Sequence, residues 1–77
     1  MTTDQLTDVL ISRLLRDHGG TKHEWRRRVG TVRLYSLKTH PHCNWEIFPT
    51  GSHTDILRIE RALDELRMVH PLLANPS

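Results

Sequence analysis

The fold depends on how one stretch is interpreted, Lys22-His23-Glu24-Trp25-Arg26-Arg27-Arg28-Val29-Gly30-Thr31-Val32-Arg33-Leu34-Tyr35. Its Gly30-Thr31 dipeptide stands between two valines. A glycine in the first position is typical of a two-residue type II′ hairpin turn, because that position needs a positive φ. On this interpretation the residues before and after the dipeptide form two antiparallel strands. Arginines and aromatic residues then gather on one face of a small sheet, which is typical of a binding surface and not of an active site.

Alternation of side chains assigns residues 23–48 to the two faces of this predicted sheet, because successive side chains on a strand point to opposite sides. A third strand is expected after a turn at His40-Pro41-His42, where the proline presets the turn dihedral. The apolar face, expected to be the core side, holds Trp25, Val29, Val32, Leu34, Trp45 and Ile47. The opposite face holds Arg26, Arg28, Arg33, Tyr35, Glu46 and Phe48. Arg27 falls in phase with the core residues, and a single long strand bent at Gly30 is the alternative.

An amphipathic helix is predicted over residues 3–18. Apolar side chains recur there at three- and four-residue spacing. Thr2 and Gln5 form a capping-box pair at its start, and Gly19-Gly20 ends it.

A second helix is predicted from the capping-box pair Ser52 and Asp55 to about Val69, since Pro71 blocks its continuation. Its buried stripe is expected to comprise Ile56, Ile59, Ala62, Leu63, Leu66 and Val69. The tail, about 71–77, is expected to fray or to pack through Leu72 and Leu73.

The sequence thus predicts one small α+β domain over residues 1–77, with the order α-β-β-β-α. Two helices would pack on one face of a three-stranded antiparallel sheet. This order resembles the double-stranded RNA-binding domain, a family that binds phosphates through a lysine-rich start of its last helix. The corresponding residues here are Ser52-His53-Thr54-Asp55. The resemblance therefore implies an architecture and not RNA binding through that helix.

Charge is concentrated locally although the net charge is only +2, from 11 Lys and Arg against 9 Asp and Glu. Five cationic residues lie within twelve consecutive positions, namely Lys22, Arg26, Arg27, Arg28 and Arg33. Such a patch can bind polyanions even on a nearly neutral protein. The single cysteine excludes an internal disulfide and indicates a reducing compartment. No apolar stretch reaches transmembrane length, so we expect a cytoplasmic protein with no membrane partner.

His40, His42 and Cys43, with His53 further along, form the one metal-like cluster of the sequence. Nitrogen and sulfur ligands suit zinc, but this spacing matches no standard zinc module. His42-Cys43-Asn44 contains the residue types of a cysteine hydrolase, yet neighbours on a strand point to opposite faces and cannot form a nucleophile and its base. We therefore expect no metal, no cofactor and no enzymatic activity.

The leading functional hypothesis is a small non-enzymatic interaction protein that binds a protein partner with an acidic surface. Its predicted binding residues are Arg26, Arg28, Arg33, Tyr35 and Phe48. The alternative is a nucleic-acid-binding module that uses the same residues, since arginines and exposed aromatics suit both interface hot spots and base stacking. Arg28 opposite Arg33 on neighbouring strands would be repulsive without an acidic partner between them, which favours a ligand for this face. The oligomeric state is left open.

Overall fold

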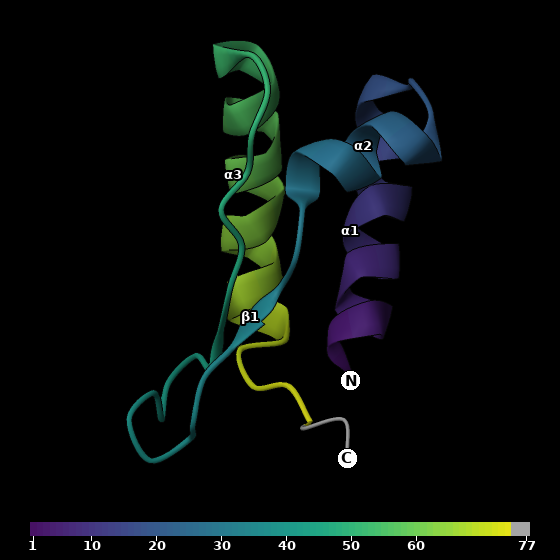
Figure 1. Ribbon diagram of the computed structural model, residues 1–77. Coiled ribbons are helices and arrows are strands. Elements are labelled where there is room, and N and C mark those ends of the chain that lie inside the picture. Colours follow the sequence, from purple (N-terminus) through teal and green to yellow (C-terminus); the bar gives the residue numbers. More distant parts are fainter. Residues whose placement is uncertain (75–77) are drawn as a thin grey trace.

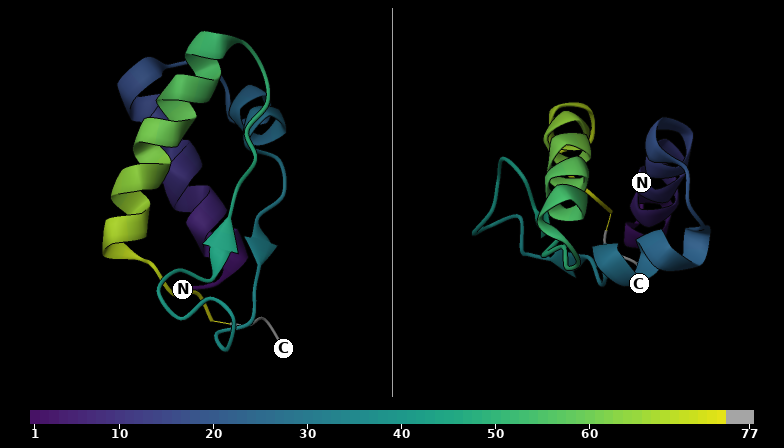
Figure 2. Two further views of the ribbon diagram at one scale, coloured as in Figure 1. Left: turned by 90° about the vertical axis from the view of Figure 1, so that its left-hand side faces the viewer. Right: turned by 90° about the horizontal axis from the view of Figure 1, so that it is seen from above.

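Three helices and a short two-stranded sheet enclose a hydrophobic core in the computed structural model, which describes residues 1–74 (Figure 1). The order of elements is α1 (Thr3–His18), α2 (Lys22–Val29), β1 (Arg33–Leu34), β2 (Trp45–Glu46) and α3 (His53–Val69). The helices α1 and α3 lie side by side and run in opposite directions, while α2 and the strands cover one side of this pair (Figure 2). The predicted three-stranded sheet with two helices is therefore wrong.

The first helix confirms its prediction at both ends. Thr2 is the N-cap of α1, and its side chain and that of Gln5 make both hydrogen bonds of a capping box. Gly19 ends the helix at φ +74°, with its N–H donating to the Leu15 carbonyl. Four side chains of α1 are fully buried, namely Leu6, Leu10, Ile11 and Leu14.

Residues 22–29 form a helix, not the predicted first strand. The Thr21 hydroxyl is the N-cap of α2 and accepts from the Glu24 N–H at 3.2 Å. At the other end Gly30, at φ +70°, donates its N–H to the Arg26 carbonyl. The positive φ expected at Gly30 is present, but it serves a helix C-terminus and not a hairpin turn.

Burial explains why the helix is favoured over the strand. Trp25 and Val29 are four residues apart, so a helix places both on its buried face, where they are 2% and 0% exposed. A strand would direct Arg27 to the core side together with them. In α2 the Arg27 side chain is exposed, and no cation needs to be buried.

The strands β1 and β2 pair antiparallel, with Arg33 opposite Glu46 and Leu34 opposite Trp45. The predicted assignment of faces is confirmed for this part of the chain. Trp45 and Ile47 are buried in the core, and Val32 and Leu34 pack partly buried against it. Arg33 and Phe48, which fall on the other face by alternation, are exposed.

Ser52 is the N-cap of α3, and its hydroxyl accepts from the Asp55 N–H. The second hydrogen bond of the predicted capping box is absent, because the Asp55 carboxylate pairs with Arg28. Ile59, Ala62, Leu63 and Leu66 are buried, whereas the predicted core residue Val69 is 68% exposed. Among residues 1–74, no helix combines the length and the apolar composition that crossing a bilayer requires.

Residues 71–74 pack against the hairpin. The Asn44 amide donates to the Leu73 carbonyl at 3.0 Å and accepts from the Leu73 N–H at 2.8 Å. Leu73 is 4% exposed, and the Ala74 N–H donates to the Met1 carbonyl. The remaining part of the predicted tail, 75–77, lies outside the described residues.

Candidate interaction surface

The outer side of the hairpin carries four polar or aromatic side chains, which we call the hairpin face: Arg33, Tyr35, Glu46 and Phe48. The Arg33 guanidinium lies over the Phe48 ring, 5.1 Å from its centroid. The Tyr35 hydroxyl donates to the Glu46 carboxylate at 3.3 Å. The hairpin register thus joins these side chains into two pairs across the strands.

Phe48 and Arg33 are the members of the hairpin face most open to a partner. Phe48 is 54% exposed, which is high for a large aromatic side chain. The ion pairs of the described residues use the arginines Arg13, Arg16, Arg26, Arg28 and Arg67, and Arg33 belongs to none of them. The Arg33 cation is therefore stabilised by an aromatic ring and retains its capacity to bind a carboxylate.

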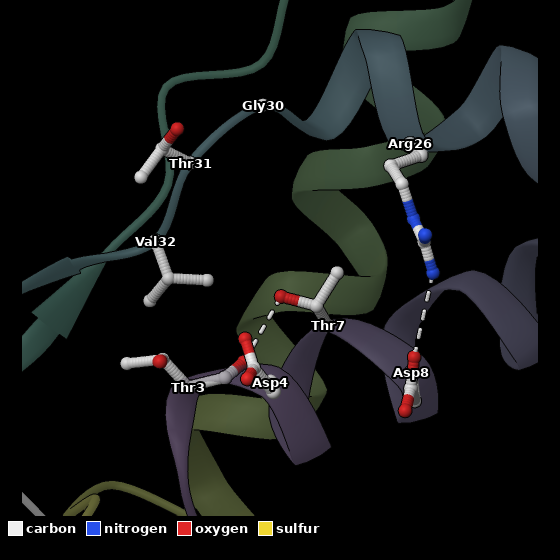
Figure 3. Close-up of a pocket in the computed structure, with 8 residues that line it drawn as sticks. All are labelled: Thr3, Asp4, Thr7, Asp8, Arg26, Gly30, Thr31 and Val32. Atoms are coloured by element: carbon white, nitrogen blue, oxygen red, sulfur yellow. Dashed lines mark hydrogen bonds and ion pairs between the residues drawn. The ribbon is translucent and has the colours of Figure 1, made fainter. Parts of the chain in front are cut away.

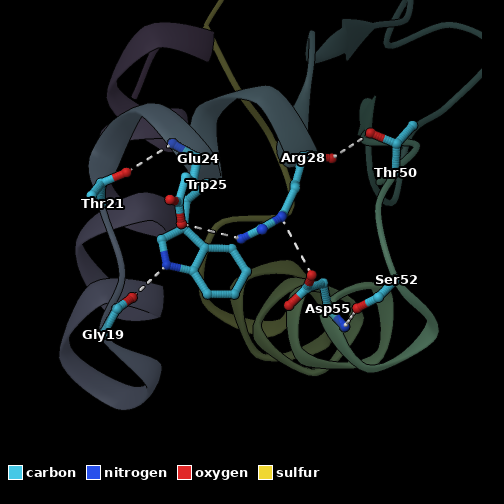
Figure 4. A network of polar contacts seen from close by, with 8 residues as sticks. All are labelled: Gly19, Thr21, Glu24, Trp25, Arg28, Thr50, Ser52 and Asp55. Atoms are coloured by element: carbon cyan, nitrogen blue, oxygen red, sulfur yellow. Dashed lines mark hydrogen bonds and ion pairs between the residues drawn. The ribbon is translucent and has the colours of Figure 1, made fainter.

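Arg28 is not on the hairpin face, because it lies on α2 and reaches toward α3. Figure 4 shows its guanidinium between two carboxylates, with Nε 3.3 Å from Asp55 and Nη1 3.8 Å from Glu24. It also lies 5.3 Å from the ring centroid of Trp25. The repulsion expected between Arg28 and Arg33 is absent, since the two side chains are not cross-strand neighbours.

Trp25 and Thr50 complete the network in Figure 4. The Trp25 indole donates to the Gly19 carbonyl at 2.7 Å, which fixes α2 against the end of α1. The Thr50 N–H donates to the Arg28 carbonyl at 2.8 Å, which holds the approach to α3 against the end of α2. These contacts give Arg28 and Trp25 a structural role at the junction of the three helices.

Arg26 is also on α2 and is exposed, but it points toward α1. Its guanidinium lies 3.7 Å from the Asp8 carboxylate (Figure 3). Of the five predicted binding residues, the structure thus brings Arg33, Tyr35 and Phe48 together and places Arg26 and Arg28 elsewhere. The two misplaced residues are those of the segment predicted as a strand.

The predicted metal candidates do not converge. His40 and Cys43 both line a hollow of about 400 Å³ with Tyr35, Glu46 and Arg67. His42 is exposed in the loop between the strands, and His53 begins α3. Within residues 1–74, no three His, Cys, Asp or Glu side chains are grouped closely enough to hold a metal ion.

The groups that line this hollow are engaged with other partners. The Cys43 thiol donates to the Trp45 carbonyl, with 3.5 Å between the sulfur and the oxygen. The His40 Nδ1 is 2.9 Å from the Thr39 hydroxyl, and the His40 ring stacks on Tyr35 at a centroid distance of 4.3 Å. No hydrogen bond joins the thiol to the imidazole among the described residues.

A second hollow, of about 490 Å³, lies between α1 and the segment that leads into β1 (Figure 3). Thr3, Asp4, Thr7 and Asp8 of α1 form one wall, and Gly30, Thr31 and Val32 form the other. The sequence analysis did not predict this hollow. It assigned the residues before Gly30 to a strand, whereas they form α2, and residues 30–32 then face α1 across the hollow. The i, i+4 spacing of Trp25 and Val29 behind Thr21 was the signal that could have indicated it.

Comparison of the chain with protein-family models, with curated protein sequences and with solved structures gave no match. The geometry of the surface is therefore the basis for any functional assignment.

Proposed function

We propose that this chain is a small non-enzymatic interaction protein that binds a protein partner through the hairpin face. The observation that carries the proposal is the pair formed by Arg33 and Phe48. A half-exposed aromatic ring beneath an arginine with no acidic partner among the described residues is the combination enriched at interface hot spots. A partner would bury the ring and present a carboxylate to the guanidinium.

The charge of the hairpin face favours protein over nucleic acid. Glu46 lies directly across from Arg33, and its carboxylate would repel phosphates at the centre of the face. Arg26 and Arg28, which the nucleic-acid alternative also requires, are paired with Asp8, Glu24 and Asp55. The exposed Phe48 and the stacked rings of Tyr35 and His40 are the features that support the alternative, since bases stack on such rings.

Capture of partners from a cell lysate by variants of the full chain tests the proposal. The double variant Arg33→Gln, Phe48→Ser removes the cation and the ring without setting a second carboxylate opposite Glu46, so we expect its partners to be lost while the fold is retained. Arg61→Gln is the matched control, because Arg61 is an exposed arginine on α3 that forms no ion pair with the described residues.

Nuclease treatment and salt separate the two functions. Protein partners should survive nuclease and depend weakly on salt, whereas binding through phosphates falls steeply and log-linearly with salt concentration. Loss of every partner on nuclease treatment would support the nucleic-acid alternative. Equal capture by wild type and the double variant would show that the hairpin face is only a solvated surface.

A further inference from the structure

Among residues 1–74, no backbone segment pairs with the outer edge of β1, and the backbone groups of this edge point away from β2. The Tyr35 N–H donates to the Asn44 carbonyl at 2.7 Å, so Tyr35 and, two residues before it, Arg33 direct their backbone groups toward β2. Because the direction alternates along an antiparallel strand, Val32 and Leu34 direct theirs outward. No hydrogen bond from a described residue reaches these outward N–H and C=O groups.

Hollows flank this edge at both ends. The hollow in Figure 3 lies beside Gly30, Thr31 and Val32, with α1 as its opposite wall. A further hollow of about 680 Å³ lies at the other end of β1, where Leu34, Leu37 and Leu73 contribute apolar surface. Space for side chains thus borders the edge beside Val32 and beside Leu34.

We propose that the outer edge of β1 binds an extended peptide segment of a partner protein, which adds a third strand to the sheet. Alternating donors and acceptors at strand spacing are complementary to another extended backbone, and a two-stranded sheet gains stability from a third strand. This inference goes beyond the proposed function, since it concerns backbone groups of the edge and not the side chains of the hairpin face.

Charge and apolar surface define the peptide. The hollow beside Val32 holds the ion pair of Asp8 with Arg26 and, in addition, Asp4, which is exposed and forms no ion pair with any residue of 1–74. A lysine or arginine of the peptide would supply its counter-charge. An apolar side chain at the other end of the peptide would fill the hollow beside Leu34 and Leu37. A second copy of this chain fits less well, because it would bring its own α1 and the carboxylates of that helix toward the same edge.

Peptide selection followed by a single-atom change in the backbone tests this inference. A library of random linear peptides displayed on phage is selected on the full-length protein, and the enriched peptides should combine β-branched residues with a lysine or arginine. The protein is then made by chemical synthesis, with the two halves joined at Cys43, and carries an ester in place of the Leu34 amide. We expect about three- to tenfold weaker binding of the selected peptide, the equivalent of one hydrogen bond.

An ester at Tyr35 is the matched control, since the Tyr35 N–H faces β2. It should lower the midpoint of unfolding more than the Leu34 ester does, because the Leu34 ester removes no N–H donor of the sheet and only makes the Arg33 carbonyl, which faces β2, a weaker acceptor. Asp4→Asn should weaken the binding of a basic peptide about two- to fivefold, as expected for the loss of a partly exposed ion pair. In hydrogen exchange, the Val32 and Leu34 amides should exchange fast in the free protein and slowly with peptide bound.

The hairpin-face variant Phe48→Ser should keep its affinity for the selected peptide, which separates this inference from the proposed function. Failure to enrich any peptide, or equal affinity of the Leu34 ester and the natural backbone, would overturn the inference. Protection of the Val32 and Leu34 amides that rises with protein concentration, without peptide, would also overturn it and assign the edge to a second copy.

Discussion

Arg28 illustrates how a side chain that suggests binding in the sequence is used for packing in the structure. Its guanidinium bridges Glu24 of its own helix and Asp55 of α3, and Asp55 has a side chain only 17% exposed. The aliphatic stem of Arg28 passes over Gly51, where an added Cβ would lie 3.3 Å from its Cγ. Arg28 therefore joins α2 to the start of α3 through charge and contact together.

Replacement of Arg28 should destabilise the fold, unlike replacement of its neighbour. Arg28→Ala leaves the Asp55 carboxylate half-enclosed without its partner, and we expect a loss of about 1–2 kcal/mol in the free energy of unfolding, above the usual value of an exposed pair. Arg27→Ala is the matched control, because Arg27 is exposed and in no ion pair with residues 1–74; its effect should stay within about 0.5 kcal/mol. Urea unfolding measures both, and equal midpoints for the two variants would contradict the structural role.

At the scale of elements, prediction from sequence succeeded at three places where one local signal stood without a competing one. The capping pair of Thr2 and Gln5, the N-cap Ser52 and the alternation through Arg33 and Phe48 are each contained in a few neighbouring residues, and the structure has all three. Residues 22–29 carried two local signals that conflict. Alternation of Trp25 with arginines favours a strand, and Thr21 with Glu24 favours a helix.

Tertiary packing decides this conflict in favour of the helix. The Trp25 side chain is buried, with the Arg28 guanidinium over its ring and its indole N–H donating to the Gly19 carbonyl, and a strand could not bury it without Arg27. The hollow beside α1 and the open edge of β1 depend on that packing, which the spacing of Trp25 and Val29 behind Thr21 indicates only through the helix that it favours. Arg26 and Arg28 were assigned to the binding surface only because residues 22–29 were predicted as a strand. In the structure they lie on α2 and not on the hairpin face.

Two threonine variants distinguish the helix from the strand in solution. Thr21→Ala removes the N-cap of α2, and we expect it to lower the free energy of unfolding by about 1 kcal/mol, with most of that regained in Thr21→Ser. Thr31→Ala is the control, because the Thr31 side chain is exposed and makes no hydrogen bond with residues 1–74. If Gly30-Thr31 formed a hairpin turn instead, Thr31→Ala would lower the midpoint of thermal unfolding more than Thr21→Ala does.

At the scale of the whole molecule, the hairpin is attached to the end of the described chain as well as to the helices. The buried Asn44 side chain satisfies both backbone groups of Leu73, and the Trp45 indole donates to the His70 carbonyl at 2.8 Å. The Ala74 N–H reaches the Met1 carbonyl, so the segment after α3 also meets the start of α1. A sheet of two short strands is marginal alone, and this segment supports it from the core side.

Neighbouring leucines in this segment provide a test with an internal control. Leu73 is 4% exposed and Leu72 is 48% exposed, although they are adjacent and chemically identical. Leu73→Ala creates a cavity beneath the hairpin, and we expect a loss of about 2–4 kcal/mol, a large fraction of the stability of so small a protein. Leu72→Ala should cost less than about 1 kcal/mol, since the side chain is already half in water. Near-ultraviolet circular dichroism during thermal unfolding follows the packing of the two buried tryptophans, Trp25 and Trp45. If both variants unfold at the midpoint of wild type, the segment after α3 does not hold the hairpin.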